Sequence, residues 1–422
     1  MFAIGVPAEG DDEPRIGLTP ETVKKLVNHG AKVSVRSGAG MRSHFSDADY
    51  EAAGAKIAKT DAEAVADADV VFTVRRPSAA LVKSMKKGAA LIGMVDPFSD
   101  ADGLNGLAKA GIALFAMELM PRITRAQSMD VLSSQSNLAG YKAVLDAAAA
   151  FDRALPMMMT AAGTVPAARV FVMGAGVAGL QAIATARRLG AIVTATDVRP
   201  AAKEQVESLG AKFIAVEDEE FKQAETSGGY AKEMSDAYKK KQADLVAEHV
   251  KNQDIVITTA LIPGRPAPKL ISKAMIESMR PGSIVVDMAA ERGGNTEMTK
   301  PGATAEHKGV RIMGELNLAG SVPVNASSLY ARNLLAFLDP MIDKEKKALA
   351  INWDDDLVKG TLVARDGSIV NAMIAERLGA SAGAAKPAKA AAKPGVKPAP
   401  NGGKDATKTN GAKKRAPKGE GK

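Results

Sequence analysis

The chain has 422 residues, of which 46% are apolar and 25% are charged, and its formal net charge is +8. This is the balance of a soluble globular protein, and the length predicts two domains. The absence of cysteine excludes disulfides, thiolate nucleophiles and cysteine-ligated metal sites, and no apolar run is long enough to suggest a transmembrane helix.

The first 120 residues alternate between strand and helix patterns. Thr19 is the expected N-cap of one helix, Pro20 its first residue and Gly30 its stop. The alternation predicts a parallel sheet with helices on both faces. Strands are expected at 1–7, 31–37, 68–74, 89–95 and 112–118, and helices at 18–30, 47–55, 79–88 and 104–111.

A polar cluster follows the last of these strands. Residues 125–130 read RAQSMD, and a helix rich in small residues is expected over 131–151. Asp130 could simply complement the dipole at the start of that helix. This explanation leaves Arg122 and Gln127 unexplained, so the cluster is a candidate site.

A second unit of strands and helices begins at residue 168. Its six expected strands match the number in a complete dinucleotide-binding sheet. After about residue 320 the chain is expected to rejoin the first domain through a helix over 327–339. The expected strands lie at 168–173, 191–197, 211–216, 254–264, 282–290 and 310–316.

These patterns predict an α/β protein with two doubly wound Rossmann-like domains and a cleft between them. The first domain is expected to be discontinuous, from 1–127 and 320–378. The second, a dinucleotide-binding domain, is expected at 128–319.

A glycine loop joins the strand at 168–173 to the helix that follows it. Gly174 permits the tight turn, Gly176 lets the backbone approach a pyrophosphate, and Gly179 lets helix and strand pack closely. The next strand ends in Asp197, eighteen residues after Gly179, where a carboxylate accepts from a ribose 2′-OH and repels a 2′-phosphate. The set predicts an NAD(H) site. Arg199 tempers this preference, since an arginine here can accept a 2′-phosphate.

Further cofactor-binding candidates lie beside these residues. The segment TTALIPGRPAP follows another strand end, and its backbone could line the nucleotide groove; a strand terminated by Pro and Gly would explain it equally well. The additional candidates are Val177, Ala178, Val198, Ala260 and Leu261.

The positive charge belongs to the C-terminal end. Residues 381–422 hold eleven Lys/Arg and two Asp/Glu, which leaves the other 380 residues with a net charge of −1. Almost no large apolar side chain occurs there, so we predict a disordered tail over 379–422. It is either a solvated extension or a segment attracted to an anionic membrane surface. Nucleic-acid binding is not expected, because no aromatic residue interrupts the basic run.

Four stretches together resemble the NAD(H)-binding alpha subunit of proton-translocating NAD(P) transhydrogenase. They are AMELMPRITRAQSMDVLSSQSNLAGYKAV, MMMTAAGTVPAARVFVMGAGVAGLQAIATARRLGA, TSGGYAKEM and TTALIPGRPAPKLI. The resemblance covers about residues 1–375 and extends more loosely to alanine dehydrogenase. It implies that NAD(H) binds here, that NADP(H) binds on a partner subunit, and that hydride passes directly between them, coupled to proton translocation.

The resemblance also implies residue roles. Arg122 would contact the dihydronicotinamide, Gln127 would reach toward the partner's nucleotide, and Asp130 and Ser133 would position carboxamide and ribose. Tyr230 would lie at the tip of a loop that folds over the nucleotide. Asn137 belongs to the same motif as a cofactor-binding candidate.

Alanine dehydrogenase is the alternative function. Arg15 matches a substrate-binding arginine of that enzyme, but Val95 and Asp96 stand where its catalytic histidine is expected. The four histidines of the chain are expected at the surface: His29, His44, His249 and His307. A third possibility is a catalytically silent NAD-binding module.

The resemblance implies partners and a location as well. The partners would be membrane-embedded transhydrogenase subunits, including the NADP(H)-binding beta subunit, and the chain itself would form a homodimer. Together with the lack of a signal peptide, this predicts a peripheral protein on the cytoplasmic face of a bacterial inner membrane. No metal site is expected.

Overall fold

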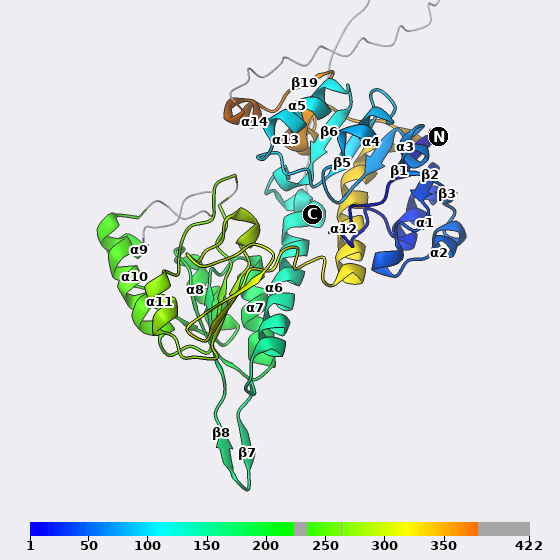
Figure 1. Cartoon of the computed structure of the whole chain (residues 1–422). Helices are drawn as coiled ribbons and strands as arrows, with labels where there is room; N and C mark the ends of the chain where they lie inside the picture. Colours follow the sequence, from blue (N-terminus) through cyan, green and yellow to red (C-terminus); the bar gives the residue numbers. More distant parts are fainter. Residues whose placement is uncertain (223–233, 263, 379–422) are drawn as a thin grey trace, which may run out of the picture. The chain divides into compact units, whose positions relative to one another are not determined.

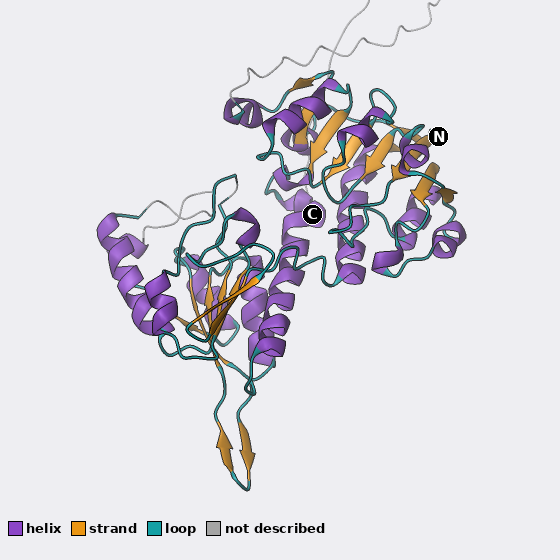
Figure 2. Ribbon diagram, viewed as in Figure 1, coloured by secondary structure: helices purple, strands orange, loops and turns teal. Residues whose placement is uncertain are grey.

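The computed structural model describes residues 1–222, 234–262 and 264–378 (Figure 1). The tail predicted over 379–422 and the expected loop residue Tyr230 lie outside the described residues. The described residues form two large α/β sheets flanked by helices (Figure 2), which confirms the predicted fold class. The proposed domain limits and the cleft stay predictions.

The N-terminal sheet has the strand order β19-β18-β6-β5-β4-β1-β2-β3. β1 to β6 run parallel, while β18 and β19 are antiparallel additions at one edge. The bounds are β1 (Phe2–Val6), β2 (Ala31–Arg36), β3 (Lys56–Ala58), β4 (Val70–Phe72), β5 (Ala90–Gly93), β6 (Ala113–Ala116), β18 (Leu362–Arg365) and β19 (Ser368–Ile369).

Both faces of this sheet are buried, because successive side chains of each strand enter different cores. Val70 and Phe72 belong to one hydrophobic cluster and Val71 to another. The first cluster also contains Tyr330 and Phe337, so the helix α12 packs on this face. The helices that accompany this sheet are α1 (Pro20–Asn28), α2 (Asp47–Ala52), α3 (Asp61–Val65), α4 (Ala79–Lys83), α5 (Ala101–Lys109), α12 (Pro323–Leu338), α13 (Asp356–Thr361) and α14 (Ala372–Arg377).

The second sheet has the order β11-β10-β9-β12-β13-β15-β14. Its six expected strands are present and parallel, and β14 is an additional antiparallel edge strand where we expected a polar turn around His307. The bounds are β9 (Arg169–Met173), β10 (Ile192–Thr196), β11 (Lys212–Phe213), β12 (Ile255–Thr258), β13 (Ile284–Asp287), β14 (Thr304–His307) and β15 (Val310–Met313).

The chain order reverses between β9 and β12, which neighbour each other at the centre of this sheet. In open parallel sheets such a switch point leaves a crevice at the carboxyl ends of the two strands, and ligands bind there. The helices that accompany this sheet are α6 (Val131–Ala150), α7 (Val177–Arg188), α8 (Ala201–Ser208), α9 (Glu219–Lys222), α10 (Asp236–Val250) and α11 (Lys273–Ser278).

Two small ribbons complete the described structure. β16 (Ile342–Asp343) pairs with β17 (Ala348–Leu349). The hairpin of β7 (Met158–Thr160) and β8 (Gly163–Val165) extends away from its sheet (Figure 1), and all of its strand residues are exposed. No helix within the described ranges has both the length and the apolar character needed to cross a bilayer.

Candidate functional site

The glycine loop lies at the switch point of the second sheet. Gly174 follows β9 with φ of +104°, a left-handed value that glycine adopts without steric cost. A Cβ on Gly179 would lie 1.8 Å from the carbonyl oxygen of Gly174, so helix α7 packs against the loop only because residue 179 lacks a side chain. At Gly176, the N-cap of α7, no atom would meet an added Cβ within 4 Å. The N-terminus of α7 is therefore open to an anion.

Asp197 follows the neighbouring strand β10 and is tightly held. One carboxylate oxygen accepts from the backbone N–H and Nε of Arg199 at 2.8 and 2.9 Å. The other accepts from the Ala175 N–H at 2.7 Å and from a terminal nitrogen of Arg199 at 3.0 Å. A ribose hydroxyl would thus compete with Arg199 for the carboxylate. The same pairing ties the Arg199 guanidinium to a carboxylate, so it opposes capture of a 2′-phosphate.

Exposed apolar side chains surround these polar groups. Val177, Val198 and Leu261 come from the carboxyl ends of three adjacent strands, and each is at least 40% exposed. Such a rim suits the flat faces of a nucleotide, since a binding groove is mostly apolar with few placed polar groups. Ala178 is half-buried beside them.

A buried asparagine fixes the backbone at Ala260. Asn295 accepts from the Ala260 N–H at 3.1 Å and donates to its carbonyl at 2.8 Å. Asp287, at the end of β13, in turn accepts from the Asn295 N–H at 2.7 Å. Neither Asn295 nor Asp287 was expected at the site, because both are ordinary strand-end and loop residues in the sequence.

The polar cluster forms a short 3-10 turn, Thr124–Met129, ahead of α6. Arg122 and Gln127 are exposed, while Ala126 and Met129 are buried in the N-terminal core. Arg125 pairs with both carboxylate oxygens of Asp355 at 2.8 Å.

Asp130 is the N-cap of α6. Its carboxylate accepts from the backbone N–H of Ser133 at 2.9 Å and from the Ser133 hydroxyl at 2.5 Å. Asp130 therefore does fill the structural role considered for it, and this role holds the Ser133 hydroxyl in a fixed place.

Helix α6 connects this cluster to the glycine loop. Gly140 packs so closely on α7 that an added Cβ would lie 2.1 Å from the carbonyl oxygen of Ala178. Ser133, Asn137 and Gly140 are spaced i, i+4 and i+7, so they share the face of α6 that meets α7. Asn137 is exposed on that face. The helix thus brings Ser133 and Asn137 to the side of the nucleotide loop, a juxtaposition that sequence spacing alone did not predict.

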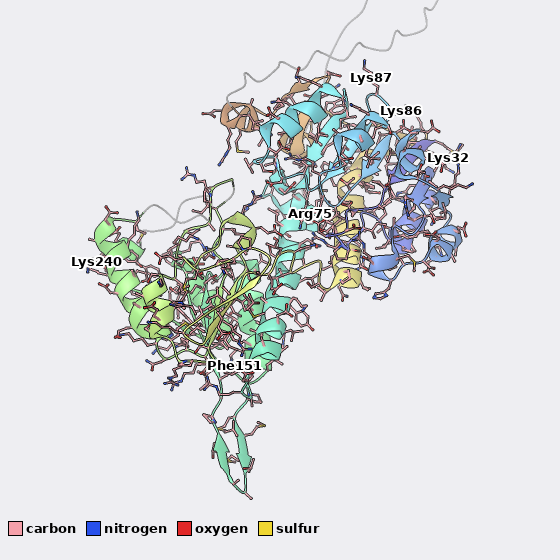
Figure 3. The ribbon with its side chains drawn as sticks, in the orientation of Figure 1. Lys32, Arg75, Lys86, Lys87, Phe151 and Lys240 are labelled. Atoms are coloured by element: carbon pink, nitrogen blue, oxygen red, sulfur yellow. The ribbon has the colours of Figure 1, made fainter. Side chains whose placement is uncertain are left out.

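The carboxyl edge of the N-terminal sheet is filled by charged side chains. Arg15 is 3% exposed and pairs with Glu13, which is 1% exposed, at 2.6 and 2.7 Å. Its remaining terminal nitrogen donates to Gln135 at 2.7 Å. Arg75, labelled in Figure 3, also donates to Glu13, at 2.8 Å. Arg15 is therefore satisfied internally and is not presented to a substrate carboxylate.

These arginines control the ionisation of Glu13. Burial alone would raise the pKa of Glu13, but hydrogen bonds from Arg15 and the charges of Arg15 and Arg75 outweigh it and lower the pKa to about 2. Burial raises the pKa of two neighbouring carboxyl groups, Glu9 and Glu118, to about 7.

The four histidines differ in their surroundings. His44 is exposed, while His29 and His307 lie near carboxylates, 3.4 Å from Asp339 and 2.8 Å from Glu277. His249 is half-buried against Phe171, and burial lowers its pKa. Val95 is buried, and Asp96 pairs with Arg292 at 2.6 Å.

Comparisons with known proteins agree with this arrangement. Two family models match: the alanine dehydrogenase/PNT N-terminal domain over residues 5–139 and the alanine dehydrogenase/PNT C-terminal domain over residues 143–372. The first of the separately encoded pieces of NAD(P) transhydrogenase subunit alpha, from Rhodospirillum rubrum, is 54% identical over 374 residues, which are 87% of this chain and 97% of that protein. The chain belongs to the NAD(P) transhydrogenase alpha-subunit family.

Two further relatives place the chain within this family. The crystal structure of the transhydrogenase from Sinorhizobium meliloti is 57% identical with a TM-score of 0.80, and the match covers 87% of this chain and 100% of that one. Alanine dehydrogenase of Halomonas elongata is 32% identical, over 89% of this chain and 96% of that enzyme. The resemblance to transhydrogenase is thereby confirmed, with alanine dehydrogenase more distant. Membership in the transhydrogenase alpha-subunit family implies further transhydrogenase subunits.

Proposed function

We propose that this chain binds NAD(H) and passes hydride directly between that nucleotide and NADP(H) on a partner subunit, in a proton-translocating NAD(P) transhydrogenase. The observation that carries the proposal is the joint arrangement of α6 and the glycine loop. One rigid helix supports both the RAQSMD turn and, through Gly140, the loop suited to a pyrophosphate. NAD(H) would supply the hydride chemistry, and the residues of the chain would hold and align it.

The nucleotide would extend from α7 toward the start of α6. Backbone N–H groups at Gly176 and the N-terminus of α7 would hold the pyrophosphate, and Asp197 would accept from the adenosine ribose. Asn137, Ser133 and Asp130 would hold the nicotinamide end. Hydride transfer between two nicotinamides needs alignment and exclusion of water, and no general acid or base.

We assign Arg122 and Gln127 to the nicotinamide end and to the partner's nucleotide. Their exposure supports this assignment, because a residue that meets a nucleotide on another subunit must be accessible before assembly. Tyr230 keeps its proposed place over the nucleotide as a prediction from the resemblance.

The geometry does not favour alanine dehydrogenase as a second function. The arginine expected to bind its substrate, Arg15, is neutralised by Glu13. At the position of the expected catalytic histidine stand the buried Val95 and Asp96, and the latter is paired with Arg292.

We further propose that the chain is peripheral to a bacterial inner membrane, on its cytoplasmic face, where it meets the membrane-embedded subunits, including the NADP(H)-binding beta subunit. The homodimer belongs to the same proposal. The β7–β8 hairpin supports it, because an isolated two-stranded ribbon is marginally stable in water and this one exposes Met158, Met159 and Val165. Sedimentation of the wild-type chain and of Val165→Lys tests it, and a wild-type monomer at micromolar concentration would refute it.

The test of function is reconstitution. The purified chain is mixed with native membranes stripped of peripheral protein, and NADPH-driven reduction of a spectrally shifted NAD analogue is followed. Activity should require both components. Gln127→Asn should then slow transfer while leaving NADH affinity nearly unchanged. Oxidation of NADH by pyruvate and ammonium in the chain alone, without transfer activity, would instead establish the dehydrogenase.

A further inference from the structure

The RAQSMD turn is supported from beneath by a buried amide. Asn333, on α12, is 7% exposed, and its Nδ2 donates to the carbonyl oxygen of Ser128 at 2.8 Å. Ser128 directly follows Gln127 in the turn. The Asn333 Oδ1 accepts from the Ser134 hydroxyl at 2.7 Å, so both ends of the amide are used.

The support continues inward as an unbroken series of hydrogen bonds. Gln135 donates to the Ser134 hydroxyl at 3.3 Å and to the carbonyl of Ala326 at 3.1 Å, and it accepts from Arg15 at 2.7 Å. Arg15 is fixed by Glu13. Every group in this series is therefore locked by a neighbour that is itself buried or paired.

Asn333 lies in a helix whose neighbouring side chains are apolar. Leu334 and Phe337 belong to the N-terminal core, and burying an amide among such residues costs free energy unless both of its polar ends are bonded. A leucine at position 333 would satisfy the requirements of the core. The amide is needed only by the turn and by Ser134, so its purpose lies at the turn.

We propose that Asn333 is a positioning residue for hydride transfer, and that Arg15, Gln135 and Ser134 hold it in place. By fixing the Ser128 carbonyl, Asn333 fixes the backbone that carries Gln127, which the proposed function places toward the partner's nucleotide. Arg15, which resembles a substrate-binding residue, here forms the base of this support. The inference rests on the proposed function for its effect on catalysis, while its effect on the turn is independent.

Asn333→Asp tests the inference directly. The aspartate keeps the volume and can still accept from Ser134, but it cannot donate to the Ser128 carbonyl. Tyr330→Phe is the matched control. Tyr330 lies on the same helix and is fully buried, and its hydroxyl bonds Thr73 and Met94 and not the turn.

Three quantities are measured on each variant: single-turnover hydride transfer in the reconstituted system, the NADH dissociation constant of the chain alone, and amide hydrogen exchange over residues 124–130. For Asn333→Asp we expect at least a tenfold slower transfer, NADH affinity within twofold of wild type, and at least tenfold faster exchange in the turn. For Tyr330→Phe, transfer and turn exchange should stay within twofold of wild type. If Asn333→Asp does not fold, Ser134→Ala removes the other support of the amide and should slow transfer about threefold.

The outcomes separate the two proposals. A wild-type chain without transfer activity overturns the proposed function, and faster turn exchange in Asn333→Asp would still support the positioning role. Equal turn exchange in Asn333→Asp and Tyr330→Phe overturns the positioning role, whatever the transfer rates. A double-mutant cycle tests the inner series: Gln135→Leu should slow transfer in the wild type but add less than twofold in an Asn333→Leu background.

Discussion

The two sheets of this protein share a topology, but their switch points have opposite contents. In the second sheet, the strand ends at β9 and β12 are bordered by Gly174 and by a backbone that Asn295 holds in place. In the N-terminal sheet, β1 and β4 are the corresponding neighbours, and the space beyond them contains Glu13, Arg15 and Arg75. One switch point is lined by groups that leave room for a ligand, and the other is filled by side chains of the protein itself.

The difference teaches that topology offers a ligand position and that side chains decide whether it is used. A glycine-rich strand end exposes backbone N–H groups to an anion, whereas a carboxylate between two guanidinium groups already satisfies them. The N-terminal sheet thus has a structural switch point, and its charges support the turn beneath Gln127. Three substitutions test this contrast, in order of expected effect.

The largest effect is expected for Glu13→Gln, which leaves Arg15 buried without a counter-charge. Breaking a buried ion pair by removing one partner costs about 3–5 kcal/mol of unfolding free energy. Because the pKa of Glu13 is lowered to about 2, its stabilisation is present above pH 4.5 and is lost as the pH falls from 4.5 toward 2. Urea unfolding of both proteins at pH 7, 4.5 and 3 should show a difference that shrinks below pH 4.5.

Glu21→Gln is the control for that experiment. Hydrogen bonds from Arg332 and then Lys25 lower the pKa of Glu21 to about 2 as well, but its side chain is 46% exposed. Surface pairs are worth about 0–1 kcal/mol. A loss as large as that of Glu13→Gln, or a Glu13→Gln difference that stays constant from pH 7 to pH 3, would contradict the filled switch point.

A smaller effect is expected for Gly179→Ala, whose methyl group would overlap the Gly174 carbonyl. Overpacking of this kind costs about 1–3 kcal/mol, and the displaced helix should also lose most of its NADH affinity. Gly176→Ala has room for its methyl group, so it should weaken NADH binding at unchanged stability. Thermal unfolding with and without NADH distinguishes them, and equal melting temperatures for the two variants would argue against close packing at residue 179.

The smallest effect is expected for Asp197→Ala. A hydrogen bond to a charged group is worth about 1.5–3 kcal/mol, so NADH should bind at least tenfold more weakly. NADPH binding should weaken less or improve, because Arg199 loses the carboxylate that now holds it. Titration of both nucleotides by fluorescence checks this. Equal weakening for both would remove the argument for NAD(H) over NADP(H).

The sequence predicted what depends on local chemistry. The helix beginning at Pro20, with Thr19 as N-cap, and the glycine loop after β9 were found because capping and tight turns require particular residues. The edge strands β3 and β14 were missed, since short strands with few buried side chains carry little apolar pattern.

Long-range contacts within the candidate site could not be predicted. Ser128 and Asn333 are 205 residues apart, and only the packing of α12 against α6 brings them together. Gly140 is a glycine inside a helix, which signals a packing reason without naming the partner. The internal pairing of Arg15 was likewise invisible, because the resemblance suggested a substrate for it.

The contact between Gly140 and Ala178 also constrains how this protein can change over evolutionary time. Each residue of α6 advances about 1.5 Å and turns about 100°. One insertion between residues 130 and 140 would therefore rotate the RAQSMD turn by about 100° relative to the glycine loop, and a deletion would do the reverse. Length changes tolerated in the β7–β8 hairpin should thus be forbidden here, and this ten-residue spacing should be invariant wherever the two motifs serve one nucleotide.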